Sequence, residues 1–172
     1  MGGQSRRMGQ AKQGMAWGGA RSMGDRMVDL ARAVCTDVRA CGPPNALPGI
    51  AHLADPSPWQ GHGPLVGIAA ALRSGLASRW LILPCDMPTL DVTDLDRLIA
   101  IDAPIVCFAV DGQLEPMPMC VASSAADSVS EYLTSGGRRL SEWIATHNPS
   151  TIQLDARHAK NINRPEDLCQ DV

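Results

Sequence analysis

Short apolar runs alternate with segments of helical periodicity along most of this chain, and this alternation limits the fold more than any other feature. Residues 80–84 form the clearest run. They are too few for a helix and apolar on both faces, as in a central parallel strand. Further strands are predicted at 38–41, 50–54, 105–110, 117–122 and 152–154. Strands that alternate with helices predict a layered α/β fold with a mostly parallel sheet.

The helices are predicted from periodicity and from their end signals. Met23, Met27 and Leu30 recur at the spacing of one buried helix face. Gly75 is typical of a helix end, and Thr93 is the predicted N-cap of a later helix. The predicted helices cover 21–35, 65–75, a segment from Thr93, 125–134, 138–147 and a short segment opened by Pro165.

Size and composition favour one globular domain, residues 1–172. Hydrophobic residues make up 45% and charged residues 19%, which excludes a disordered chain. The longest nearly apolar stretch, 64–72, is far shorter than the roughly 20 residues that cross a bilayer. The sequence shows no secretory signal, and its six cysteines show no C-x-x-C pair. We therefore expect reduced cysteines and a cytoplasmic protein without a membrane span.

Charge is unevenly distributed along the sequence. Residues 1–24 carry +4 and no acid, whereas the whole chain carries −3, so the remainder carries −7. A basic, glycine-rich opening on an acidic protein indicates a local site for a small anion or a solvated terminus. It does not indicate a nucleic-acid surface, which needs basic residues spread over a face.

The densest cluster of functional residue types lies at residues 2–12. Gly2 and Gly3 would let backbone N–H groups approach phosphate oxygens, and Arg7 and Lys12 would offset their charge. The cluster is not a Walker A loop, because no hydroxyl residue follows Lys12, and it is not G-x-G-x-x-G.

Two further clusters follow. Asp86 comes directly after the 80–84 run, where α/β proteins bind ligands, so it either carries Mg²⁺ or caps a loop. Gly63 and Gly67 lie in a glycine-rich segment that opens the 65–75 helix, and it is either a ligand loop or a plain turn.

Four motifs in this order resemble one family. They are GG-x-S-x-R-M-G-x-x-K from Gly2, GPLVGI from Gly63, PCDMP around Asp86 and NINRPEDL from Asn161. The series is similar to that of the molybdenum cofactor guanylyltransferases of MobA type, which are nucleotidyltransferases of Rossmann-like fold with three layers. The resemblance runs from residue 2 to about residue 168.

The resemblance implies transfer of GMP from GTP to molybdenum-bound molybdopterin, with release of pyrophosphate. It also implies Mg²⁺ as cofactor and contacts with other maturation proteins of this cofactor. A phosphate nucleophile is largely ionised at neutral pH and needs no strong general base. The residues that the resemblance assigns are Gly2 and Gly3 for the nucleotide, Arg7 and Lys12 for the triphosphate, Asp86 for Mg²⁺, Asp55, Gly63 and Gly67 for the guanosine side, and Asn161 and Asn163 for the pterin.

The sequence departs from the family pattern at three places. Ala11 stands where the family usually has an acid, and residues 39–42 lack the Asn that some members use for nucleotide contact. The hydrophobic first strand that precedes the glycines in the family is absent from the printed sequence. Its loss would leave neighbouring strand edges unpaired, so we expect about ten further N-terminal residues in the natural protein.

Two other functions remain open. One is a cytidylyltransferase for molybdopterin, or a related enzyme with another phosphorylated acceptor. The other is a degenerate, non-catalytic protein that binds a nucleotide or delivers a cofactor.

Overall fold

Helices and strands alternate through the part of the chain that the computed structural model describes, which comprises residues 16–17, 22–61, 63–162 and 167. The predicted α/β class is confirmed. The elements, in chain order, are α1 (Met23–Val34), β1 (Arg39–Cys41), β2 (Ala51–Leu53), α2 (Pro64–Arg73), β3 (Arg79–Ile82), α3 (Val92–Ala100), β4 (Ile105–Val110), β5 (Gln113–Ala122), α4 (Ala126–Thr134), α5 (Leu140–Ala145) and β6 (Ser150–Gln153), with a 3₁₀ turn at Ser123–Ala125.

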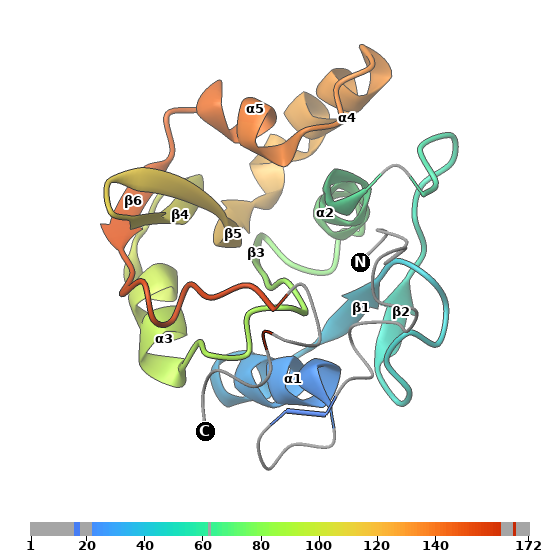
Figure 1. The fold of residues 1–172 in the computed structure, drawn as a ribbon. Coiled ribbons are helices and arrows are strands. Elements are labelled where there is room, and N and C mark those ends of the chain that lie inside the picture. The colour runs from blue at the N-terminus through green and yellow to red at the C-terminus, as the bar shows by residue number, and fades with distance from the viewer. Residues whose placement is uncertain (1–15, 18–21, 62, 163–166, 168–172) are drawn as a thin grey trace.

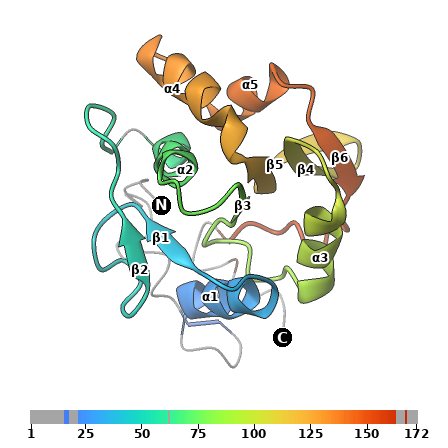
Figure 2. The ribbon, with the colours of Figure 1, turned by 180° about the vertical axis from the view of Figure 1, so that it is seen from behind.

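The strands form two sheets, and Figures 1 and 2 show the smaller one on the β3 side of the larger. The pair β1 and β2 is parallel. The larger sheet has the order β3-β5-β4-β6. Strand β5 is antiparallel to both β3 and β4, and β6 is parallel to β4. Three of its four strands therefore run in one direction, and β5 alone runs against them.

Helices cover both faces of the larger sheet, which makes three layers (Figure 1). The strand β4 shows why, because its successive side chains enter opposite cores. Ile105 and Cys107 pack with residues of α2, α4 and α5, whereas Val106 and Phe108 pack with residues of α1 and α3. All four side chains are buried. A wholly apolar strand is what a sheet covered on both faces requires.

The prediction for β3 as a strand is confirmed, but its described pairing differs from the parallel one expected. Its apolar run suggested a central strand with parallel neighbours, but within the described residues its hydrogen-bonded neighbour is β5, which is antiparallel. All four residues of β3 are only half-buried. Hydrophobicity reports burial and does not specify which strand pairs with which.

Helix ends follow local capping chemistry. The Oγ of Ser22 accepts the Asp25 N–H at 3.0 Å and starts α1. Gly75, with φ +71°, follows the end of α2 as predicted. The N-cap of α3 is Asp91 and not Thr93, because Asp91 accepts the Asp94 N–H at 3.0 Å while Asp94 accepts the Asp91 N–H at 3.1 Å. This reciprocal capping box pairs two backbone N–H groups that a Thr93 cap would leave without a partner.

Strand β5 begins earlier than predicted. Asp111 and Gly112 have φ of +50° and +78° and form the two-residue turn of the β4–β5 hairpin. Pairing therefore starts at once, with Gln113 opposite Val110. Glu115, which precedes the predicted strand 117–122, is therefore a strand residue.

Several sequence predictions lie outside the described residues, namely the basic opening and the helix at Pro165. Within the described residues, β1 has only β2 and β3 has only β5 as a hydrogen-bonded neighbour. In the same part of the chain, no helix combines the length and the apolar character needed to cross a bilayer.

Candidate active site

A cavity of about 390 Å³ opens between the small sheet and the edge of the large one. Its size lies within the usual range for small-molecule sites. Consecutive residues line it along β1 and along the segment 80–86, so the cavity runs beside both strands. Helices α1 and α2 contribute further walls, through Met27, Val28 and Ala31 on one side and Pro64, Gly67, Ile68 and Ala71 on the other.

Three residues predicted for substrate or metal binding line this one cavity, namely Gly63, Gly67 and Asp86. Asp86 lies beyond the carboxyl end of β3, and Gly63 is the N-cap of α2. The N-terminus of a helix presents free N–H groups and a partial positive charge. The lining of the cavity thus includes a carboxylate and an anion-attracting helix end, which suits a metal-bound polyphosphate.

Glu115 of β5 is a candidate functional residue that the sequence analysis missed. Burial raises the pKa of its carboxyl, and the nearby charge of Asp86 acts in the same direction, while a hydrogen bond with the Met117 backbone opposes both. Met117 itself lines the cavity. The sequence does hold a weak signal, a single carboxylate inside an apolar, proline-containing strand, but the predicted strand began only at residue 117.

The carboxylate of Asp86 fits a magnesium ion chemically. Mg²⁺ takes oxygen ligands, and proteins usually hold it through one or two carboxylates together with substrate phosphates and water. Asp86 is half-buried at the cavity wall. Glu115 is also half-buried and feels the charge of Asp86, but it is not among the cavity-lining residues.

The loop that carries Asp86 is anchored from two distant parts of the chain. The Ile162 N–H donates to the Asp86 carbonyl oxygen at 2.8 Å. From α1, the Arg26 side chain donates to the carbonyl oxygens of Leu90 at 3.0 Å and Pro88 at 3.4 Å. These bonds satisfy backbone carbonyls in a segment without regular structure, and they hold the loop in place.

Gly67 permits the close approach of α2 to β1. A Cβ at this position would lie 2.9 Å from the Cys41 Cβ and 3.7 Å from its Sγ. The Cys41 thiol already contacts the Gly67 carbonyl oxygen at 3.5 Å. Burial raises the pKa of this thiol and the nearby Asp55 adds to the rise, so Cys41 stays a neutral packing group at pH 7.

Gly67→Ala should therefore lower the free energy of unfolding by about 1–3 kcal/mol, because the added methyl group overpacks the contact with β1. Urea unfolding measures the change. The control is the same substitution made in a Cys41→Gly background, where the blocking Cβ is absent. Equal losses in both backgrounds would mean that this contact is not the cause.

The structure places Asp55 and Asn161 less directly at the cavity. The Asp55 carboxylate accepts the Gly61 N–H at 3.4 Å and closes the loop between them, and Asp55 is not among the cavity-lining residues. Asn161 is exposed and precedes Ile162, which bonds to Asp86. Five other predicted site residues lie outside the described residues: Gly2, Gly3, Arg7, Lys12 and Asn163.

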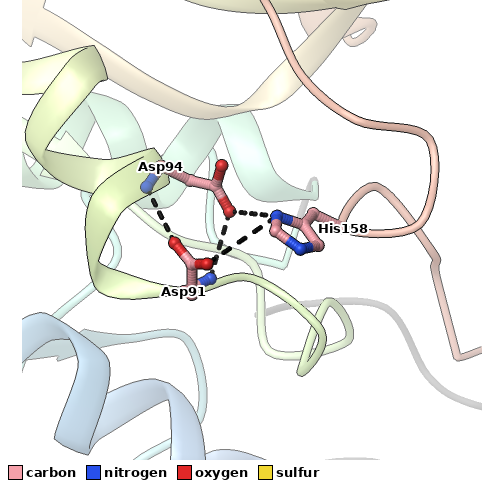
Figure 3. A group of neighbouring side chains, drawn as sticks. All are labelled: Asp91, Asp94 and His158. Carbon is pink, nitrogen blue, oxygen red and sulfur yellow. Dashed lines mark hydrogen bonds and ion pairs between the residues drawn. The ribbon is translucent and has the colours of Figure 1, made fainter.

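Asp91, Asp94 and His158 form a separate polar cluster at the start of α3 (Figure 3). Their ligand atoms lie within 4.8 Å of one another. The Asp94 Oδ2 contacts the His158 Nδ1 at 2.7 Å and accepts the Asp91 N–H at 3.1 Å. Hydrogen bonds within the cluster already occupy these atoms, so its described role is to cap α3 and tether His158.

A three-layer α/β fold with a carboxylate and a glycine-capped helix at one cavity is typical of α/β domains that bind nucleotides. The family model for the MobA-like NTP transferase domain matches residues 1–151. The chain belongs to this family.

Curated relatives carry more specific names. The molybdenum cofactor guanylyltransferase of Shewanella amazonensis is 32% identical over 63% of this chain and 58% of its own length. The molybdenum cofactor guanylyltransferase of Cupriavidus necator H16 is 35% identical over 62% of this chain and 58% of its own length. The chain thus spans about 58% of these two relatives. A probable molybdenum cofactor guanylyltransferase of Synechococcus elongatus is 30% identical over 96% of this chain and 92% of its own.

Solved structures share the fold at low identity. Molybdopterin-guanine dinucleotide biosynthesis protein A from Archaeoglobus fulgidus superposes with a TM-score of 0.75 at 20% identity, covering 98% of this chain and 92% of that one. The 2-C-methyl-D-erythritol 4-phosphate cytidylyltransferase from Thermus thermophilus has a TM-score of 0.67 at 15% identity, covering 92% and 90%. Both support the nucleotidyltransferase fold.

Proposed function

We propose that the protein transfers GMP from GTP to the terminal phosphate of molybdenum-bound molybdopterin. An oxygen of the acceptor phosphate forms a bond to the α-phosphorus of GTP, and the bond from that phosphorus to the bridging oxygen breaks, so pyrophosphate leaves. The observation that carries the proposal is the convergence of Asp86, Gly63 and Gly67 on one cavity. Family membership and the names of the relatives support the choice of substrates.

The residues of the cavity would act by positioning and by neutralising charge. The acceptor phosphate is already largely ionised at neutral pH, so no strong base is required. Asp86, with Glu115 nearby, would hold Mg²⁺, which supplies charge neutralisation at the phosphates when bound. The N-terminus of α2 at Gly63 would attract the negatively charged nucleotide. Transfer then depends on in-line placement of acceptor and donor.

Parts of the proposed site lie in the opening of the chain. Gly2 and Gly3 would contact the nucleotide and its phosphates, and Arg7 and Lys12 would neutralise the triphosphate. Asp55 would lie on the guanosine side, and Asn161 and Asn163 would lie near the pterin. We also propose that residues 1–172 act as one domain in the cytoplasm, in contact with other maturation proteins of the cofactor.

The competing function is cytidylyl transfer to molybdopterin. The residues at 39–42 leave the choice of base open, because they lack the Asn that some family members use for nucleotide contact. A single assay separates the two. Pyrophosphate release is measured with molybdopterin, Mg²⁺ and either GTP or CTP.

We expect kcat/KM for GTP to exceed that for CTP by about 10²-fold, because a site that hydrogen-bonds one base leaves buried polar groups unpaired with the other. A preference for CTP would replace the guanylyltransferase by the cytidylyltransferase. Binding of nucleotide without pyrophosphate release would support the non-catalytic alternative.

A further inference from the structure

The loop with Asp86 and the segment after β6 are joined at two points, although about 70 residues separate them. The Ile162 N–H bonds to the Asp86 carbonyl at 2.8 Å, and the Thr89 hydroxyl donates to the His158 carbonyl at 3.0 Å. Ile162 is fully buried. The position of the segment 155–162 therefore affects the position of Asp86, and it also sets where Asn161 lies.

The His158 side chain fixes this segment to α3. Its Nδ1 lies 2.7 Å from the Asp94 Oδ2 and 4.0 Å from the Asp91 Oδ2. Figure 3 shows the imidazole facing both carboxylates from the segment after β6. The Asp94 side chain is only 5% exposed, so this hydrogen bond is made away from most of the solvent. A charge-assisted bond of this kind is stronger than a neutral one.

The anchor is itself rigid. Asp94 is held in the capping box with Asp91 at the first turn of α3, and Leu95 and Leu98 of that helix are fully buried in the core that α1, α3, β4 and β5 share. Because Asp94 is fixed, the His158 side chain bonded to it is held in place, and the residues next to His158 in the chain are restrained with it.

We propose that His158 is a positioning residue for the reaction. By holding the segment 155–162 on α3, it keeps Ile162 bonded to the Asp86 loop, and so it maintains Asp86 and Asn161 in the geometry that transfer requires. This inference rests on the proposed function, but the structural link from His158 to Ile162 can be tested without it.

The test compares His158→Ala, His158→Asn and the wild-type protein. In His158→Ala we expect the Ile162 amide to exchange its hydrogen about tenfold faster, and kcat for pyrophosphate release to fall about tenfold with KM for GTP within about twofold. His158→Asn retains a donor near the Nδ1 position and should recover most of both losses.

His147→Ala is the matched control. His147 is another half-buried histidine, bonded to the Ser128 Oγ at 2.7 Å and the Trp143 carbonyl at 2.8 Å, in the layer that contains α4 and α5. The His147→Ala variant should have a lower unfolding midpoint, while its Ile162 amide exchange and its kcat stay unchanged.

The outcomes separate the inference from the proposed function. If the wild-type protein releases pyrophosphate but His158→Ala matches its kcat or its Ile162 exchange, the positioning role is wrong. If the wild-type protein shows no transfer to molybdopterin, the proposed function is wrong, and Ile162 exchange still decides whether His158 holds this segment.

Discussion

Asp86→Ala should reduce kcat for pyrophosphate release by about 10²–10³-fold, because the substitution removes the carboxylate proposed to hold Mg²⁺ and so several kcal/mol of charge stabilisation. The fold should survive. Ile162 bonds to the Asp86 backbone carbonyl, which alanine retains. The rate is measured at saturating GTP and molybdopterin over a range of Mg²⁺ concentrations, together with the unfolding midpoint.

The matched control for this prediction is Asp127→Ala. Asp127 is an exposed carboxylate in the first turn of α4, and it does not line the cavity. Asp127→Ala removes one negative charge, as Asp86→Ala does, and it should keep the wild-type kcat. Turnover of Asp86→Ala at the wild-type rate would remove Asp86 from the mechanism.

Trp143→Ala has the largest expected effect on stability. The indole of Trp143 is 1% exposed and packs in the core between the sheet and α2, α4 and α5. Its Nε1–H donates to the Ser128 Oγ at 3.1 Å. Replacement by alanine should cost about 3–5 kcal/mol. For a chain of this length, the melting temperature should fall by about 6–20 °C.

Trp143→Phe serves as the control, because it keeps most of the buried ring area; it loses the hydrogen bond, worth about 1 kcal/mol, and part of the indole packing. Calorimetry measures both variants. At a temperature where Trp143→Ala remains folded, its kcat should equal that of the wild type, because Trp143 does not line the cavity. A loss below about 1 kcal/mol would contradict the assignment of Trp143 to a tightly packed core.

Much of the fold could be predicted because its signals are local. The strand β4 occupies the predicted residues 105–110, and α1, β1, β2 and α2 lie within a few residues of their predicted ranges. Periodicity, capping residues and glycine stops act over a few positions along the chain. The N-cap of α3 was misplaced by two residues, because Thr93 and Asp91 are both good N-caps and only the reciprocal bonds with Asp94 distinguish them.

The candidate site was predictable only in part. Asp86, Gly63 and Gly67 were identified from motifs, and the structure brings them to one cavity. Glu115 was missed because its proximity to Asp86 depends on the pairing of β3 with β5, which no local pattern encodes. The role of Asp55 stays a prediction, since its described hydrogen bond closes its own loop.

The alternation of apolar runs and helical segments was enough to predict a layered α/β fold, because burial on one face or on two leaves a direct imprint on residue order. This alternation does not determine the order of the strands in the sheet. That β5 pairs with β3, and that His158 meets Asp94 across 64 residues, followed only from the three-dimensional arrangement. Contacts between residues far apart in the chain depend on how whole elements pack, and many strand orders satisfy the same local pattern.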